Sequence, residues 1–171
     1  GSEGAIRMIL KVSALADWNT ANRSLFGFQV DASNRFFART TAGAGSDYAL
    51  NVFYAGGGVA INRILTKLNN FSDWVDIWIS WSLAQGQFNI YTNGILCDWM
   101  RWNSETYPVA LTGDWVGNLA VASAKLGQYS SPWKGWMTHP TILNRPVTAA
   151  EVRSTNPYGV ILSDGDSRTA G

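Results

Sequence analysis

The sequence predicts an all-β protein, an antiparallel sandwich or barrel that carries one short helix near the C-terminus. Short alternating apolar runs are separated by Gly, Asn and Asp clusters at near-regular spacing, which is typical of such folds. Charged residues make up only 15% of the chain and 17 glycines are present, which disfavours a charged helical bundle. A length of 171 residues is enough for one domain with a substantial core.

The first part of the chain supplies five predicted strands. Their hydrophobic side chains alternate or form short apolar runs, with polar or glycine-rich segments between them. The segment from Asp17 to Ser24 is polar and is predicted to be a loop, and Asp31 to Asn34 forms a turn between the second and third strands. The predicted strands are residues 5–12, 24–30, 35–40, 48–54 and 59–65.

The strongest local signal lies between Trp74 and Trp102, which hold five of the nine tryptophans. The dipeptide Asn93-Gly94 separates two alternating runs, and such a pair favours a type I′ hairpin turn. A two-residue loop pairs Thr92 with Ile95, Ile90 with Cys97 and Phe88 with Trp99 on one side of the ribbon. Asn89, Tyr91, Leu96, Asp98 and Met100 then lie on the other side.

The strand before this hairpin extends the same division into two faces. Val75, Ile77, Ile79, Trp81 and Leu83 form a core face. The alternate residues Trp74, Asp76, Trp78, Ser80 and Ser82 are polar except for two tryptophans, as expected of a wet, partly aromatic face. Such a face either recognises a ligand or packs against another layer.

Later segments complete the fold with two further strand candidates, residues 119–124 and 133–143, and one helix. Thr148 and Glu151 have the spacing of a capping box, which predicts a helix of at most two turns that ends at Asn156-Pro157. Residues 1–160 are expected to form a single domain, and residues 161–171 a flexible tail or linker.

Composition and charge exclude several classes of function. A net charge of +1 without clusters of Lys and Arg argues against nucleic-acid binding. No apolar run approaches the length of a membrane span, so no membrane insertion is expected. Cys97 is the single cysteine, which rules out an intrachain disulfide, and its position on the core face of the hairpin suggests a buried apolar residue.

Three segments of this chain resemble the concanavalin A-like lectin/glucanase superfamily, in particular its laminin G-like and pentraxin-like jelly rolls. Residues 74–81 are similar to a tryptophan-led strand of that superfamily, and GQFNIYTNGIL (86–96) is similar to its hairpin. WKGWMTHPTILNRPVTAAEV (133–152) resembles its closing strand and short helix. The resemblance implies a two-sheet antiparallel jelly roll. It does not choose among glycan-binding, protein-binding and structural members.

Catalysis is not expected, and no cofactor is predicted. The glucanases of this superfamily place their carboxylates in an E-x-D-x-x-E pattern, which none of Glu3, Glu105 and Glu151 fits. His139, the single histidine, has no serine elbow to accompany it. Calcium is compatible with the turn at residues 164–167, but no specific motif supports a Ca²⁺ site.

The aromatic and polar residues of the second ribbon face are the predicted ligand site. A sugar ring needs an aromatic platform for its C–H face and Asn, Asp or Gln for its hydroxyl groups. The alternative is that a loop or a neighbouring subunit covers Trp78 and Tyr91. The predicted ligand-binding residues are Asp76, Trp78, Asn89, Tyr91, Asp98 and Trp102.

The favoured hypothesis is therefore a non-catalytic, lectin-like carbohydrate-recognition module of a secreted, cell-surface or phage adhesion protein. Its partner would be a glycan or cell-surface polysaccharide. A second hypothesis is a structural domain of a virion, a capsid decoration or tail component, that binds protein partners in a viral or surface assembly. A minor third is a divergent glycoside hydrolase that uses Asp76 or Asp98. The expected location is extracellular, at the cell surface or on a virion.

Overall fold

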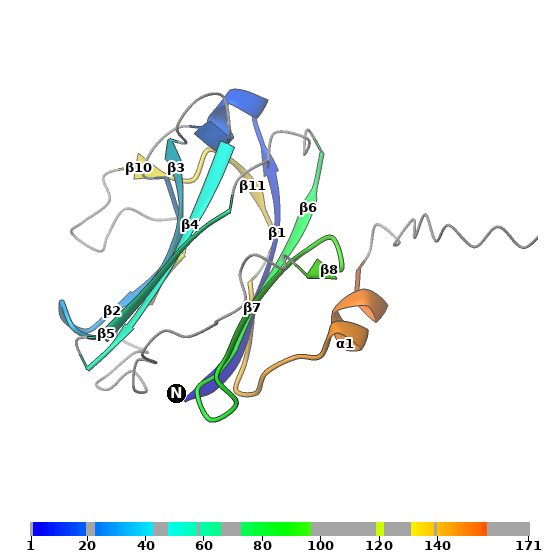
Figure 1. The fold of residues 1–171 in the computed structure, drawn as a ribbon. Coiled ribbons are helices and arrows are strands. Elements are labelled where there is room, and N and C mark those ends of the chain that lie inside the picture. The colour runs from blue at the N-terminus through cyan, green and yellow to red at the C-terminus, as the bar shows by residue number, and fades with distance from the viewer. Residues whose placement is uncertain are drawn as a thin grey trace, which may run out of the picture.

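A computed structural model shows two β-sheets packed face to face, with one short helix on the outside of the first sheet (Figure 1). It describes residues 2–19, 23–42, 48–57, 59–65, 73–96, 119–121, 131–138 and 140–156. The predicted all-β sandwich is confirmed. The predicted tail, residues 161–171, lies outside the described residues.

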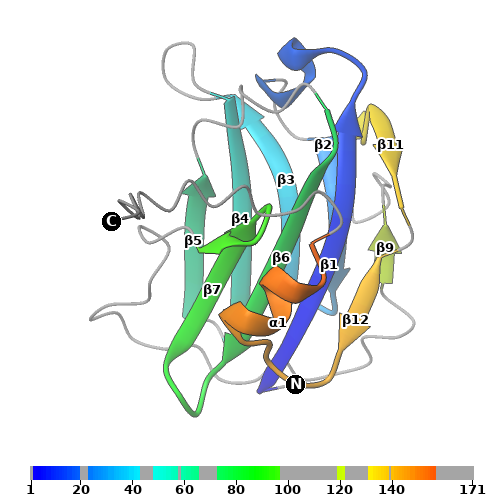
Figure 2. The same ribbon diagram turned by 90° about the vertical axis from the view of Figure 1, so that its right-hand side faces the viewer.

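The first sheet has the order β11-β1-β6-β7-β8, and β12 also pairs with β1. All of its pairings are antiparallel. The outer face of this sheet, the one turned away from the second sheet, is toward the viewer in Figure 2. Its strands are β1 (Glu3–Val12), β6 (Val75–Ser82), β7 (Gln87–Thr92), β8 (Ile95–Leu96), β11 (Gly135–Met137) and β12 (Thr141–Leu143).

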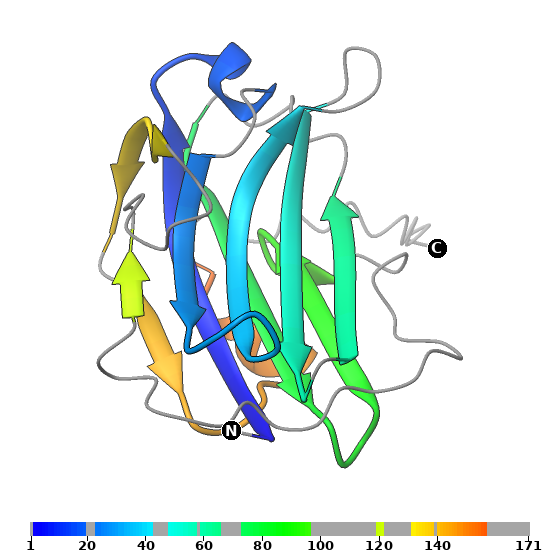
Figure 3. The same cartoon turned by 90° about the vertical axis from the view of Figure 1, so that its left-hand side faces the viewer.

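The second sheet has the order β10-β2-β3-β4-β5, and β9 also pairs with β2. Its pairings are antiparallel except for the short parallel pairing of β10 with β2. Its outer face is toward the viewer in Figure 3. Its strands are β2 (Arg23–Gln29), β3 (Arg35–Ala42), β4 (Tyr48–Gly56), β5 (Val59–Leu65), β9 (Leu119–Val121) and β10 (Ser131–Pro132).

The core between the sheets forms from the alternate residues of both. The predicted core face of β6 and β7 is confirmed, because Val75, Ile77, Ile79, Phe88 and Ile90 are all buried in it. Facing them from the second sheet are buried side chains of β2 to β5, including a cluster of aromatic rings from Phe26, Phe28, Phe36 and Tyr54. This apolar layer is the main source of stability in a sandwich that has a single cysteine.

The predicted hairpin is also confirmed. Thr92 pairs with Ile95 and Tyr91 with Leu96, around a two-residue loop. Asn93 and Gly94 both have positive φ, 49° and 84°, as a type I′ turn requires. The further predicted partners Cys97 and Trp99 lie outside the described residues.

The structure differs from the sequence prediction at three places, one of which is the short strand β10, which was not predicted. A 3₁₀ helix, η1 (Leu15–Asn19), occupies part of the segment predicted as a loop; Asp17 accepts a hydrogen bond from the Ala14 amide, and Trp18 is buried. The single strand predicted over 133–143 is two short strands, β11 and β12, which pair with different parts of β1. Pro140 lies between them and has no N–H to donate to a continuous ladder.

The predicted helix is α1 (Ala149–Ser154), and its capping box is formed as expected. The Glu151 amide donates to Thr148 Oγ1 at 3.2 Å, and the Thr148 amide donates to Glu151 Oε2 at 2.8 Å. Glu151 also pairs with Arg145 at 2.7 Å. Figure 2 shows α1 lying across the outer face of the first sheet, over β1, β6 and β7.

Candidate functional site

The predicted ligand face of β6 and β7 lies beneath α1. Trp78 and Tyr91 are neighbours in register on the two strands and are only 5% and 3% exposed. Together with Ala5 they pack against Val147 and Val152, which come from the C-terminal segment and from α1. Burial raises the pKa of the Tyr91 hydroxyl. The structure therefore shows the covered alternative for these two rings.

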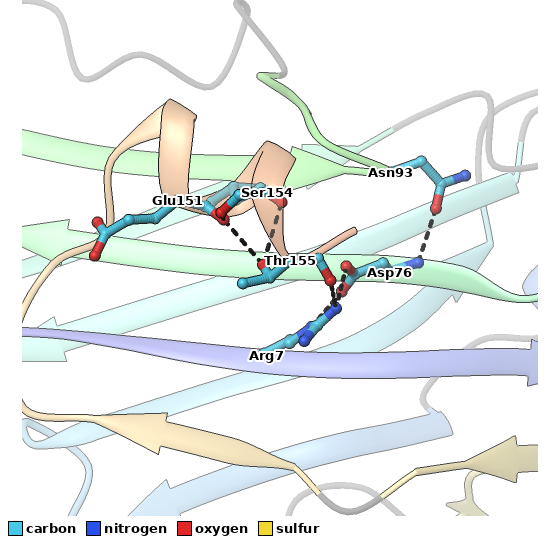
Figure 4. A network of polar contacts seen from close by, with 7 residues as sticks. Arg7, Asp76, Asn93, Glu151, Ser154 and Thr155 are labelled. Carbon is cyan, nitrogen blue, oxygen red and sulfur yellow. Dashed lines mark hydrogen bonds and ion pairs between the residues drawn. The ribbon is translucent and has the colours of Figure 1, made fainter. Parts of the chain in front are cut away.

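Asp76, the polar residue expected beside Trp78, is fully buried. Its carboxylate accepts two hydrogen bonds from Arg7, from Nε at 3.0 Å and from Nη2 at 2.8 Å. Arg7 Nη2 also donates to the carbonyl oxygen of Thr155, just past α1, and the guanidinium lies 5.3 Å from the Trp78 ring centroid. Figure 4 shows Arg7 between Asp76 and Thr155. Asp76 is thus part of the contact that holds the end of α1 on the sheet.

The remaining predicted residues do not complete a site in the described structure. Asn89 is half-buried and its side chain hydrogen-bonds to Tyr91. Asp98 and Trp102 lie outside the described residues. The wet face expected of β6 is not open, because Asp76, Trp78, Ser80 and Ser82 are all buried. The physical reason is that α1 and the segment leading to it supply a further layer: the Val147 amide, for example, donates to Ser80 Oγ at 3.0 Å. A ligand-binding role for the six residues stays a prediction.

A different surface brings aromatic and polar side chains together on the outer face of the second sheet. Phe37 of β3 and Phe53 of β4 are direct partners in register, and their rings stack with centroids 4.9 Å apart and planes 7° apart. The Arg35 guanidinium lies 4.7 Å from the Phe53 centroid, and the Arg39 guanidinium lies 5.3 Å from the Phe37 centroid. Two stacked rings thus carry one cation each.

Two asparagines extend this surface across β4 and β5. Arg39 Nε donates to Asn51 Oδ1 at 3.2 Å, and Asn51 Nδ2 donates to Asn62 Oδ1. Phe37 and Asn51 are buried, Arg35, Arg39 and Phe53 are half-buried, and Asn62 is exposed. We call this surface the arginine–aromatic face; its residues are Arg35, Phe37, Arg39, Asn51, Phe53 and Asn62.

The charge of the second sheet is one-sided. Strands β2 to β4 contain three arginines, Arg23, Arg35 and Arg39, and no aspartate or glutamate. Guanidinium groups match carboxylate geometry, and stacking on an aromatic ring restricts their orientation before a ligand arrives. The arginine–aromatic face therefore combines guanidinium groups, side-chain amides and a partly exposed ring.

The sequence contained a signal for this face that the interpretation of the strands did not use. Arg35, Phe37 and Arg39 alternate with Phe36 and Ala38 in the strand predicted over 35–40. Asn51 and Phe53 alternate in the same way in the next strand. The alternation of both strands places these residues together on the side opposite the core.

Among the residues that the structure describes, no group of three or more His, Cys, Asp or Glu side chains could hold a metal ion. Within that same part of the chain, no helix is long and apolar enough to cross a membrane.

No protein-family model matches this chain, and no curated protein matches it by sequence. Solved structures do match. One is the CBM40 module of the Ruminococcus gnavus IT-sialidase, bound to α2,3-sialyllactose, with a TM-score of 0.61 and 13% sequence identity. The match covers 90% of this chain and 82% of the CBM40 chain. The SAP-like pentraxin of Limulus polyphemus has a TM-score of 0.57 and 14% identity, and covers 93% of this chain and 72% of its own. The binding domain of botulinum neurotoxin serotype D has a TM-score of 0.58 and 11% sequence identity, and the match covers 88% of this chain and 35% of the neurotoxin chain. At these identities the likeness shows the jelly-roll fold alone.

Proposed function

We propose that this domain is a non-catalytic carbohydrate-binding module whose ligand is an acidic glycan bound at the arginine–aromatic face. The observation that carries the proposal is the stacked pair of Phe37 and Phe53 with a guanidinium group over each ring. An acidic sugar offers a matching set of groups: an apolar C–H face, several hydroxyl groups and one carboxylate.

The residues of the arginine–aromatic face differ in exposure, and each proposed contact with the sugar follows from that exposure. Phe53 is half-buried, so part of its ring is available for contact with a sugar. Arg35 lies over the same ring, and a guanidinium group is the side chain best matched to a carboxylate. Asn62 is exposed on the neighbouring strand and offers an amide for hydroxyl groups. Arg39 and Asn51 lie behind them and hold the array in place through their hydrogen bond.

The likeness to solved structures supports the ligand class without deciding it. Two of the matching structures are CBM40 modules bound to α2,3- and α2,6-sialyllactose, which are acidic trisaccharides. Strands β3 and β4, which carry most of the arginine–aromatic face, contain no carboxylate, and Asp76 is engaged by Arg7. A secreted, cell-surface or phage setting belongs to this proposal as an expectation.

The test is the affinity of three variants for sialyllactose, measured by calorimetry. Phe53→Ala removes the aromatic contact and Arg35→Gln removes the charge of the guanidinium group, and we expect each change to weaken binding about ten- to a hundredfold. Ile95→Ala is the matched control, since Ile95 is 62% exposed on β8 of the other sheet. Folded Phe53→Ala and Arg35→Gln proteins with the affinity of the parent would refute the proposed site.

A structural role in a virion or surface assembly stays a prediction. Burial of Trp78 between chains would favour this role, whereas Trp78 is buried within its own chain. A glycoside hydrolase role that depends on Asp76 would have to break the ion pair of that residue with Arg7.

A further inference from the structure

The outer face of the first sheet carries one widely exposed aromatic ring. Trp136 of β11 is 55% exposed, and it is the only aromatic side chain among the exposed large hydrophobic residues of the described structure. Figure 2 shows β11 at the edge of the sheet, well apart from α1. The layer that covers Trp78 and Tyr91 therefore leaves this ring open.

The backbone beneath Trp136 is held from several sides. Gly135 has φ +148°, and a Cβ there would lie 2.1 Å from the Lys11 carbonyl oxygen, so β11 lies against β1 at a distance that only glycine allows. The Trp133 indole N–H donates to the Trp136 carbonyl at 3.2 Å, and Met137 packs against the core. The indole of Trp136 is thus presented from a fixed strand.

An ion pair lies beside the ring. Lys11 is the register partner of Trp136, and its Nζ donates to Asp73 Oδ1 at 2.9 Å. Both charged side chains reach solvent, with 34% of the Lys11 side chain and 78% of the Asp73 side chain exposed. The hydrogen bond from Lys11 also lowers the pKa of the Asp73 carboxyl.

We propose that Trp136, Lys11 and Asp73 form a second carbohydrate subsite, for an uncharged pyranose. The ring supplies the stacking platform, the ammonium group donates to a hydroxyl oxygen, and the carboxylate accepts from a neighbouring hydroxyl. Because the two charges cancel, this subsite does not select for an acidic sugar, in contrast to the arginine–aromatic face. It rests on the proposed function only for the general ligand class, carbohydrate.

The two sites lie on the outer faces of opposite sheets (Figures 2 and 3). One molecule could therefore hold two glycan chains at once, or two parts of one branched glycan, which would raise avidity for a dense glycan surface.

The test follows the indole N–H resonances of the ¹⁵N-labelled protein during titration with lactose, maltose and cellobiose. The Trp136→Phe spectrum assigns the Trp136 signal, and we expect that signal to shift with saturation for at least one of these sugars. Lys11→Met should weaken that binding about tenfold. Ile142→Ala is the matched control, because Ile142 is 49% exposed on β12, which pairs with the same strand β1.

Two results would overturn the proposal. One is a Trp136 signal that none of the sugars moves. The other is a signal that shifts with protein concentration alone, which would make the ring a contact between copies of this chain. The Phe53→Ala variant separates this test from that of the proposed function. This variant should bind sialyllactose more weakly, and its Trp136 signal should still shift when a neutral sugar is added. The two proposed sites can therefore be refuted independently of each other.

Discussion

At the scale of the residue, Asp76 links its own strand, β6, to β1 and to the hairpin turn. Its carboxylate binds Arg7 of β1, and its backbone amide and carbonyl pair with Asn93 in the hairpin turn, at 2.9 and 2.8 Å. Arg7 in turn reaches Thr155 (Figure 4). The Asp76 carboxylate, which the sequence predicts to bind a sugar, therefore helps to hold β1 and the end of α1 in place in the structure.

This role predicts a large loss of stability in Asp76→Asn. The change leaves Arg7, whose side chain is 19% exposed, without its charged partner, and removing one member of a buried pair costs about 3 kcal/mol. Urea unfolding should show this loss. Asp73→Asn is the control, because Asp73 pairs with Lys11 in solvent and its loss should leave the midpoint nearly unchanged. Equal midpoints for the two variants would contradict the anchoring role.

The residues of both faces also show what alternation in a sequence can predict. It placed Asp76, Trp78 and Tyr91 on the side away from the core, which is correct. It could not show that Val152 covers them, since that contact joins segments some 60 to 75 residues apart. The stack of Phe37 on Phe53 depends on the β3–β4 register, which requires both strands to be sorted into faces.

At the scale of the element, α1 depends on local capping as well as on packing. Six residues are too few for a helix that is stable alone. Hydrogen bonds from Arg145 and from Thr148 hold the pKa of Glu151 at about 2, below its ordinary value of 4.5. Ionised Glu151 thus favours the folded state, and this contribution is complete above pH 4.5 and disappears as the pH falls toward 2.

The variant Glu151→Gln should remove that dependence. Parent and variant should differ in free energy of unfolding at pH 7, and the difference should shrink between pH 4.5 and pH 2. Chemical unfolding at a series of pH values measures it. A difference that stays constant over this range would show that the charge of Glu151 does not support α1.

The close approach of β11 to β1 leads to a second prediction at this scale, which concerns the variant Gly135→Ala. A Cβ at this position would clash with the Lys11 carbonyl oxygen, so the strand must move away from β1. We expect a lower melting temperature and an altered Trp136 indole resonance. Thr138→Ala, an exposed change one residue past the strand, is the control and should alter neither. An unchanged melting temperature in Gly135→Ala would mean that the approach of the two strands is not needed.

Elements with local signals were the most predictable. The Asn93-Gly94 turn and the Thr148–Glu151 capping box are each determined within a few residues, and both are present. The break at Pro140 and the helix η1 were not predicted, since each depends on how a short segment meets β1 or the core.

At the scale of the whole molecule, the two sheets differ in the charged residues of their strands and in whether a helix covers their outer face. The first sheet has α1 over part of its outer face, and the second has three arginines and no carboxylate in β2 to β4. The sequence predicted the all-β class and strands β2 to β5 closely, but the arrangement of two distinct outer faces depends on long-range strand pairing.

The charge of the second sheet predicts that binding of an acidic glycan depends on salt. The affinity for sialyllactose should fall several-fold between about 0.01 M and about 1 M salt, because the Debye length shrinks from about 30 Å to about 3 Å. Any binding of lactose, which is uncharged, should be nearly constant over the same range. Equal salt dependence for the two sugars would remove the electrostatic part of the proposal.

The most direct test of the central claim is a map of amide chemical-shift changes on titration with sialyllactose. We predict that the largest changes fall in β3, β4 and β5, around Arg35, Phe53 and Asn62, and that α1 is unaffected. Changes concentrated on β6, β7 and α1, or no change at any sugar concentration, would contradict it.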